Sequence, residues 1–78
     1  MRKVQVKFSA INDIRAFVNT MCKYSADAEL KSGNYTVNAR SLMGIFALDL
    51  MRPIDLIVNG DDSGKLLDKV SKYIVCEQ

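Results

Sequence analysis

The sequence predicts an α+β fold in which helices cover one face of a four-stranded antiparallel sheet. Several segments alternate apolar and polar residues, which is the pattern of strands that bury one face. Other segments carry apolar residues at helical spacing. A Gly-Asn pair separates two of the alternating segments, as in a β-hairpin. In chain order the elements read β-α-β-β-α-β-α, and such mixtures place their helices together on one face of the sheet.

Length and composition limit the function classes. The chain has 78 residues, and we expect residues 1–78 to form a single domain, since domains typically hold about 100–150 residues. Hydrophobic residues make up 49% and charged residues 26%, which is ordinary for a globular domain and argues against disorder. The net charge of +2 is too small to predict a nucleic-acid-binding surface. No run of about 18 apolar residues is present, so we expect no membrane span.

The first two elements are a strand and an amphipathic helix. The strand is expected at residues 3–9, where apolar and polar side chains alternate. The helix should run for about three turns, with Asn12 or Asp13 as its N-cap. Its predicted apolar stripe consists of Ile14, Phe17, Val18, Met21 and Cys22.

A hairpin and a short helix follow. Residues 27–31 and 35–39 alternate around the turn at residues 32–34, where Gly and Asn tolerate positive φ. Ser41 then precedes an apolar segment and is expected to cap a helix that extends to Leu50. Because this segment is apolar on nearly every side, it is either buried or partly exposed for a partner.

The last two elements are a strand at residues 54–58 and a C-terminal helix. The helix is expected to follow a turn at residues 59–63, and its lysines form a row on the solvated face. Docking of an acidic partner on that row is the less favoured alternative. The predicted apolar stripe of this helix consists of Leu66, Leu67, Val70, Tyr73 and Ile74. The predicted core includes Phe17, Leu30, Val37, Leu56, Leu67 and Val70.

The sequence contains no histidine, which excludes an imidazole as base, nucleophile, phosphoryl acceptor or metal ligand. Cys22 and Cys76 do not have the spacing of metal ligands. We expect both to be reduced thiols in a cytoplasmic protein. Cys22 should lie on or near the buried face of the first helix. We identify no Gly-rich phosphate loop, catalytic pair or metal cluster. We therefore expect no enzymatic activity, no catalytic residue, no cofactor and no metal.

One motif resembles a known family. The segment Val37-Asn38-Ala39-Arg40-Ser41-Leu42-Met43-Gly44-Ile45 is similar to V-N-x-K-S-I-M-G-V/L of HPr, the phosphocarrier protein of the bacterial sugar phosphotransferase system. Residues 23–30 and the element order also resemble HPr, so the likeness covers nearly the whole chain. It implies an HPr-like open-faced sandwich with strand order 1-4-2-3.

The resemblance fails where HPr carries its phosphorylatable histidine, in a G-x-H-A-R-P-like stretch at the start of the first helix. Residues 8–16 form a shorter loop here, without histidine or proline. We therefore expect an HPr-like protein that has lost phosphotransfer and serves as a regulatory protein-protein interaction module related to the sugar phosphotransferase system. The alternative is a phosphocarrier that uses another residue. A nucleic-acid module is a more distant third reading, since aromatic residues on the strands are too few for base stacking.

The resemblance also implies the candidate site residues. Ser41 matches a serine that a dedicated kinase phosphorylates in HPr proteins of Gram-positive type, and a phosphate at a helix N-cap would face free N–H groups. The implied protein partners are that serine kinase, a transcription regulator or a phosphotransferase-system component, with no nucleic acid and no membrane. The partner-binding candidates are Arg40, Leu42, Met43, Ile45 and Phe46. Among them we expect Met43 and either Phe46 or Ile45 to be partly exposed.

Overall fold

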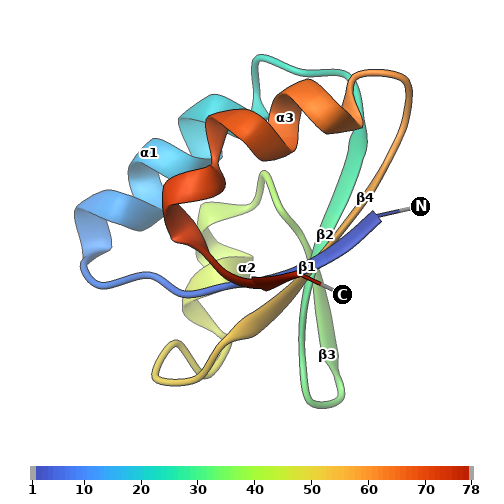
Figure 1. Cartoon of the computed structure of the whole chain (residues 1–78). Helices are drawn as coiled ribbons and strands as arrows, with labels where there is room; N and C mark the ends of the chain where they lie inside the picture. Colours follow the sequence, from blue (N-terminus) through green and yellow to red (C-terminus); the bar gives the residue numbers. More distant parts are fainter. Residues whose placement is uncertain (1, 78) are drawn as a thin grey trace.

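The computed structural model describes the backbone of residues 2–77 and the side chains of residues 2–75. Five strands form one antiparallel sheet in the order β3-β2-β4-β1-β5, and α1 and α3 lie side by side across one of its faces (Figure 1). The elements are β1 (Arg2–Val6), α1 (Ile11–Met21), β2 (Asp27–Ser32), β3 (Tyr35–Asn38), α2 (Leu42–Phe46), β4 (Ile54–Asn59), α3 (Ser63–Lys69), a 3₁₀ turn (Ser71–Tyr73) and β5 (Ile74–Glu77). The α+β prediction and the order 1-4-2-3 of the first four strands are confirmed.

The fifth strand replaces the end of the predicted C-terminal helix. Helix α3 ends at Lys69, and Ile74 pairs with Val6 of β1 in the sheet. Tyr73, expected on the helix stripe, is buried in the 3₁₀ turn, where its carbonyl accepts a hydrogen bond from Lys7 N–H at 2.9 Å. The β-branched pair at residues 74–75 favours a strand, and β5 covers an edge of β1 that would otherwise be open.

The core lies between the sheet and the helices. Of the predicted core residues, Val37 alone is only partly buried, because it lies on the edge strand β3. Three aromatic rings, of Phe8, Phe17 and Tyr73, pack with centroids 5.0–6.0 Å apart and join the end of β1 to α1 and the 3₁₀ turn. The confirmed core residues, all less than a tenth exposed, are Phe17, Leu30, Leu56, Leu67 and Val70.

Helix α1 begins earlier than predicted. Its N-cap is Ala10, which has no capping side chain, so the assignment of Asn12 or Asp13 as the cap is wrong. Asp13 instead reaches back from the first turn, where its Oδ2 accepts a hydrogen bond at 3.1 Å from the N–H of Ser9, the residue before the N-cap. Cys22, predicted on or near the buried face of the first helix, is exposed; it is the C-cap residue that follows the buried Met21. The side chain of Cys76 lies outside the described residues.

The predicted hairpin is confirmed. Ser32 pairs with Tyr35, so the turn has two residues, and Gly33 at its first position has φ of 60°. Glycine is favoured at that position because it adopts positive φ without a Cβ clash.

Candidate functional site

Ser41 lies in the connection between β3 and α2 and is the N-cap of α2. Its Oγ accepts a hydrogen bond from Gly44 N–H at 3.1 Å, which confirms the predicted cap. Its own N–H donates to the carbonyl of Asn38 at 3.0 Å, and its carbonyl accepts from Ile45 N–H at 3.0 Å. Three hydrogen bonds therefore fix the backbone and the hydroxyl of this residue.

Gly44 allows α2 to pack closely against this cap. A Cβ at residue 44 would lie 3.0 Å from Ser41 Oγ and 3.2 Å from Val37 Cβ, which is closer than side chains normally pack. The glycine in the motif therefore has a local packing role.

Helix α2 is shorter than predicted, since it ends at Phe46 and not at Leu50. The loop that follows has its own hydrogen bonds: Asp49 Oδ1 accepts from Met51 N–H at 3.1 Å, and Asp49 Oδ2 lies 3.7 Å from Arg52 Nε. An aspartate that bonds to the backbone two residues later stabilises a turn in place of further helix.

The partner-binding candidates on α2 separate into two groups. Met43 is 79% exposed and Phe46 is 39% exposed, whereas Ile45 is fully buried and Leu42 is partly buried against the core. Residues three apart lie on the same side of a helix, so 42 and 45 face inward while 43 and 46 face outward. Ile45 is therefore a core residue, and its assignment as a partner contact is wrong in this structure.

The structure gives Arg40 a role other than the predicted partner contact. Its guanidinium donates to three backbone carbonyls at and after the end of α1: Nε to Met21 at 3.1 Å, and Nη2 to Tyr24 at 2.6 Å and to Ala26 at 2.7 Å. Arg40 thus links the start of α2 to α1.

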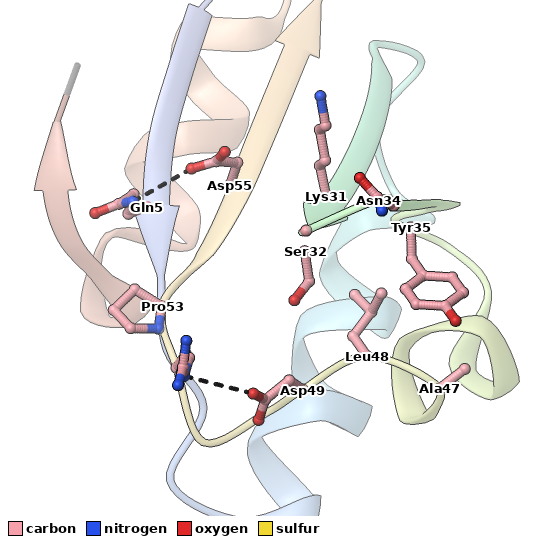
Figure 2. Close-up of a pocket in the computed structure, with 12 residues that line it drawn as sticks. Gln5, Lys31, Ser32, Asn34, Tyr35, Ala47, Leu48, Asp49, Pro53 and Asp55 are labelled. Atoms are coloured by element: carbon pink, nitrogen blue, oxygen red, sulfur yellow. Dashed lines mark hydrogen bonds and ion pairs between the residues drawn. The ribbon is translucent and has the colours of Figure 1, made fainter.

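Two further exposed apolar side chains near α2 have no signal in the sequence. Tyr35, at the start of β3, is 69% exposed, and Met51 in the loop after α2 is 83% exposed. Tyr35 and Ala47 line the same groove, so this tyrosine lies near the end of α2 (Figure 2). Neither residue could be identified as exposed from its local pattern.

The start of α1, where the family histidine was expected by resemblance, carries a different chemistry. Ile11 is 65% exposed, Asn12 and Arg15 are exposed, and the Asp13 carboxylate is hydrogen-bonded to Ser9 N–H. A carboxylate and an apolar side chain thus lie near the beginning of the helix. No imidazole lies there, because the sequence contains no histidine.

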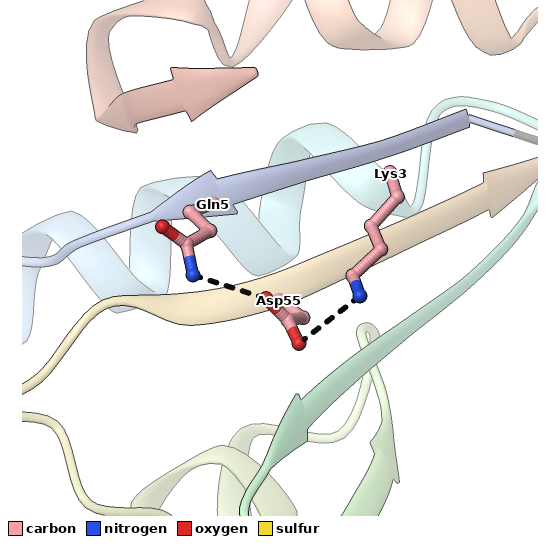
Figure 3. A network of polar contacts seen from close by, with 3 residues as sticks. All are labelled: Lys3, Gln5 and Asp55. Carbon is pink, nitrogen blue, oxygen red and sulfur yellow. Dashed lines mark hydrogen bonds and ion pairs between the residues drawn. The ribbon is translucent and has the colours of Figure 1, made fainter. Parts of the chain in front are cut away.

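The groove beside Tyr35 has a volume of about 580 Å³ and lies between the β2–β3 hairpin and the loop after α2 (Figure 2). Both of its carboxylates are already engaged. Asp49 contacts Arg52, and Asp55 lies between Lys3, at 3.6 Å, and Gln5, whose Nε2 donates to it at 3.3 Å (Figure 3). The groove therefore offers no free acid for a metal or for proton transfer.

Asp62 forms a structural contact at the start of α3. Its Oδ2 accepts hydrogen bonds from Ser25 N–H at 3.0 Å and from Ser25 Oγ at 3.2 Å. The Ser25 N–H, more than the hydroxyl, holds the pKa of this carboxyl below its ordinary value. The contact joins the turn after α1 to α3.

The described part of the chain contains no group of three or more His, Cys, Asp or Glu residues placed to hold a metal ion. None of the helices within residues 2–77 combines the length and the apolar character needed to cross a bilayer.

Comparison with known proteins relates the chain to one family. A sequence model described as the PTS HPr component phosphorylation site matches residues 13–75. The phosphocarrier protein HPr from Bacillus anthracis is 28% identical over 92% of each chain, with a TM-score of 0.72. HPr from Thermoanaerobacter tengcongensis is 26% identical over 90% of this chain and 84% of its own, with a TM-score of 0.74.

A third solved structure is Crh, described as a catabolite repression containing protein of Bacillus subtilis. It is 26% identical to this chain, over 90% of this chain and 82% of its own, with a TM-score of 0.69. Its structure is described as an intertwined dimer with a swapped domain. Phosphocarriers and a protein named for catabolite repression are thus both among the similar structures.

Proposed function

This chain belongs to the HPr family, and we propose that within the family it is a regulatory protein-protein interaction module and not a phosphocarrier. The observation that carries the proposal is the pair of exposed apolar side chains, Met43 and Phe46, which lie beside Ser41, the N-cap of α2. We call Met43 and Phe46 the docking surface. As the family implies, the module would act in the cytoplasm and have no enzymatic activity of its own.

The docking surface has the properties of a protein contact. Apolar side chains that are exposed together on a small domain lose contact with water when a partner covers them, and this favours association. Methionine is unbranched and flexible, so Met43 can adapt to the shape of a partner. A single charge placed among such side chains would oppose binding, because the charge would have to be desolvated.

Ser41 supplies the proposed regulation. Ser41 lies two residues before Met43 and five before Phe46, so a phosphate on its hydroxyl would add about two negative charges next to the docking surface. Such a change would strengthen the binding of a partner with basic groups and weaken that of an apolar or acidic partner. The proposed partners are a serine kinase, a transcription regulator or another phosphotransferase-system component.

A phosphocarrier is the second candidate, because the matched family model and two of the similar structures bear that name. Phosphoenolpyruvate-driven transfer needs an acceptor that can pass the phosphoryl group on. The phosphate ester of serine is too stable to release its phosphoryl group to the next acceptor. Asp13 could form an acyl phosphate, but its negative charge repels the donor, and it is already hydrogen-bonded to Ser9. We therefore expect no transfer from the general phosphotransfer enzyme.

The docking surface and Ser41 are tested together with an HPr serine kinase and ATP, with phosphate incorporation located by mass spectrometry. We expect modification of Ser41 in the wild type and none in Ser41→Ala. Met43→Asp should be phosphorylated much more slowly, because the kinase must cover the docking surface. Asn19→Asp, which adds the same charge at an exposed position on α1, is the control and should behave as the wild type. An unmodified wild type beside a modified control HPr would overturn the Ser41 proposal, and equal rates for Met43→Asp and Asn19→Asp would overturn the docking surface.

A further inference from the structure

The geometry points to Arg40 as a positioning residue, which holds the docking surface in place by fixing the start of α2 against the end of α1. This inference rests on the proposed function of the docking surface. Arg40 is half-buried and its polar contacts run toward α1, so we assign its effect on a partner to the position of α2 and not to direct contact.

The Arg40 side chain binds the C-terminal end of α1 and the segment that follows it. Carbonyls at this end of a helix carry partial negative charge, and basic side chains commonly bind them. Helix α1 has no basic residue in its own last turn. The guanidinium of Arg40 supplies a positive charge there: Nε donates to the carbonyl of Met21, the last residue of α1, and Nη2 donates to the carbonyls of Tyr24 and Ala26 beyond it, at distances of 2.6–3.1 Å.

The backbone around Arg40 is fixed as well. Arg40 N–H donates to Asn38 Oδ1 at 2.8 Å, and the fully buried Ala39 donates its N–H to the carbonyl of Ala28 at 3.0 Å. Side chain and backbone therefore hold one short connection between β3 and α2. Ser41, the next residue, is the cap from which α2 starts.

Helix α2 depends on such external links. It has five residues, and a helix that short does not persist in water by its own hydrogen bonds. Ile45 and Leu48 anchor its far end in the core, and the Arg40 link anchors its start. Met43 and Phe46 face outward, so they do little to hold the helix that presents them.

Loss of the guanidinium contacts should leave the domain folded but let α2 sample other orientations. The apparent affinity of a partner falls in proportion to the fraction of molecules that remain competent to bind. If that fraction falls to about one fifth, the KM of a kinase for this protein rises about fivefold. The kcat should stay unchanged, since Ser41 is presented normally once the complex has formed.

The test measures KM and kcat for phosphorylation of Ser41 by an HPr serine kinase. Arg40→Met should raise KM about fivefold at constant kcat, and Arg40→Lys, which keeps a cation with three donors, should restore much of the affinity. Val4→Ala is the control for lost stability, because Val4 is buried in β1, which is adjacent to neither β2 nor β3 in the sheet, and its KM should equal that of the wild type. Arg40→Gln replaces Arg40→Met if the latter does not fold.

Hydrogen exchange separates this inference from the proposed function. The amides of Ile45 and Ala47 should exchange faster in Arg40→Met than in Val4→Ala, whether or not any kinase acts on the protein. A wild-type KM in Arg40→Met, an equal rise in Val4→Ala, or unchanged exchange at α2 would each overturn the positioning role. Failure of the kinase to modify the wild type would count against the proposed function alone, and the exchange result would then decide the role of Arg40.

Discussion

Replacement of Gly44 by alanine should destabilise the protein, although alanine is the better helix former. On helix propensity alone, the substitution would raise the free energy of unfolding by about 1 kcal/mol. The new Cβ, however, would lie 3.0 Å from Ser41 Oγ, 3.2 Å from Val37 Cβ and 3.3 Å from Ser41 Cβ. Ser41 is fixed by its hydrogen bonds, and Val37 is paired with Leu30 in the sheet, so neither neighbour moves freely.

The expected size of the effect follows from these opposing contributions. Insertion of a methyl group into closely packed surroundings typically costs about 1–3 kcal/mol. After subtraction of the propensity gain, the free energy of unfolding should fall by about 1 kcal/mol. With a urea m-value of about 1 kcal/mol/M for a small domain, the unfolding midpoint should fall by about 1 M.

A double-mutant cycle identifies the clash with Ser41. Ser41→Ala alone should cost about 1 kcal/mol through loss of the cap. In that background the Oγ is absent, so Gly44→Ala should cost measurably less than in the wild type. Urea unfolding followed by circular dichroism gives all four stabilities. A stabilising Gly44→Ala, or the same change in both backgrounds, would refute the packing geometry described for Ser41 and Gly44.

Three further predictions concern the fold. Leu56→Ala, at a fully buried position in β4, should lower the free energy of unfolding by about 2–5 kcal/mol, which thermal and urea unfolding would measure. Asp62→Asn should be less stable than the wild type at pH 6. Because Ser25 N–H lowers the pKa of Asp62, the wild type should lose this advantage as the pH falls below about 4. A difference between the two unfolding midpoints that does not shrink in acid would contradict this. Cys22 is exposed and should react with a thiol reagent in the native protein, at a rate close to that in urea; strong protection, located by peptide mass spectrometry, would contradict its placement.

The sequence predicted those parts of the fold that depend on local patterns. Alternation defined β1, β2 and β4, and Gly33 marked the hairpin, because each of these signals lies within a few residues. The fifth strand was missed because residues 66–74 also fit a helical stripe. The competing interaction, pairing of Ile74 with Val6, joins the two ends of the chain and leaves no local trace.

The candidate site was predictable to a similar extent. The cap at Ser41 is local and was predicted, whereas the acceptors of Arg40 are backbone carbonyls 14–19 residues away, which side-chain patterns do not reveal. The exposure of Met43 was predicted and is confirmed, whereas the choice between Phe46 and Ile45 as the second exposed residue stayed open, since all residues of this helix but Gly44 are large and apolar. The end of α2 at Phe46 depends on the Asp49 turn, a contact that the apolar pattern did not indicate.

The proposal that this HPr-family protein has lost phosphotransfer is tested most directly by incubation with phosphoenolpyruvate and the general phosphotransfer enzyme. Wild type and Ser41→Ala are compared with an HPr that retains its histidine, and intact-protein mass spectrometry counts the phosphoryl groups gained. We expect the control HPr to be phosphorylated and both forms of this protein to remain unmodified, because the 78 residues include no imidazole to accept the group. Phosphorylation of Ser41→Ala from phosphoenolpyruvate would contradict the proposal and identify the protein as a phosphocarrier that uses another residue.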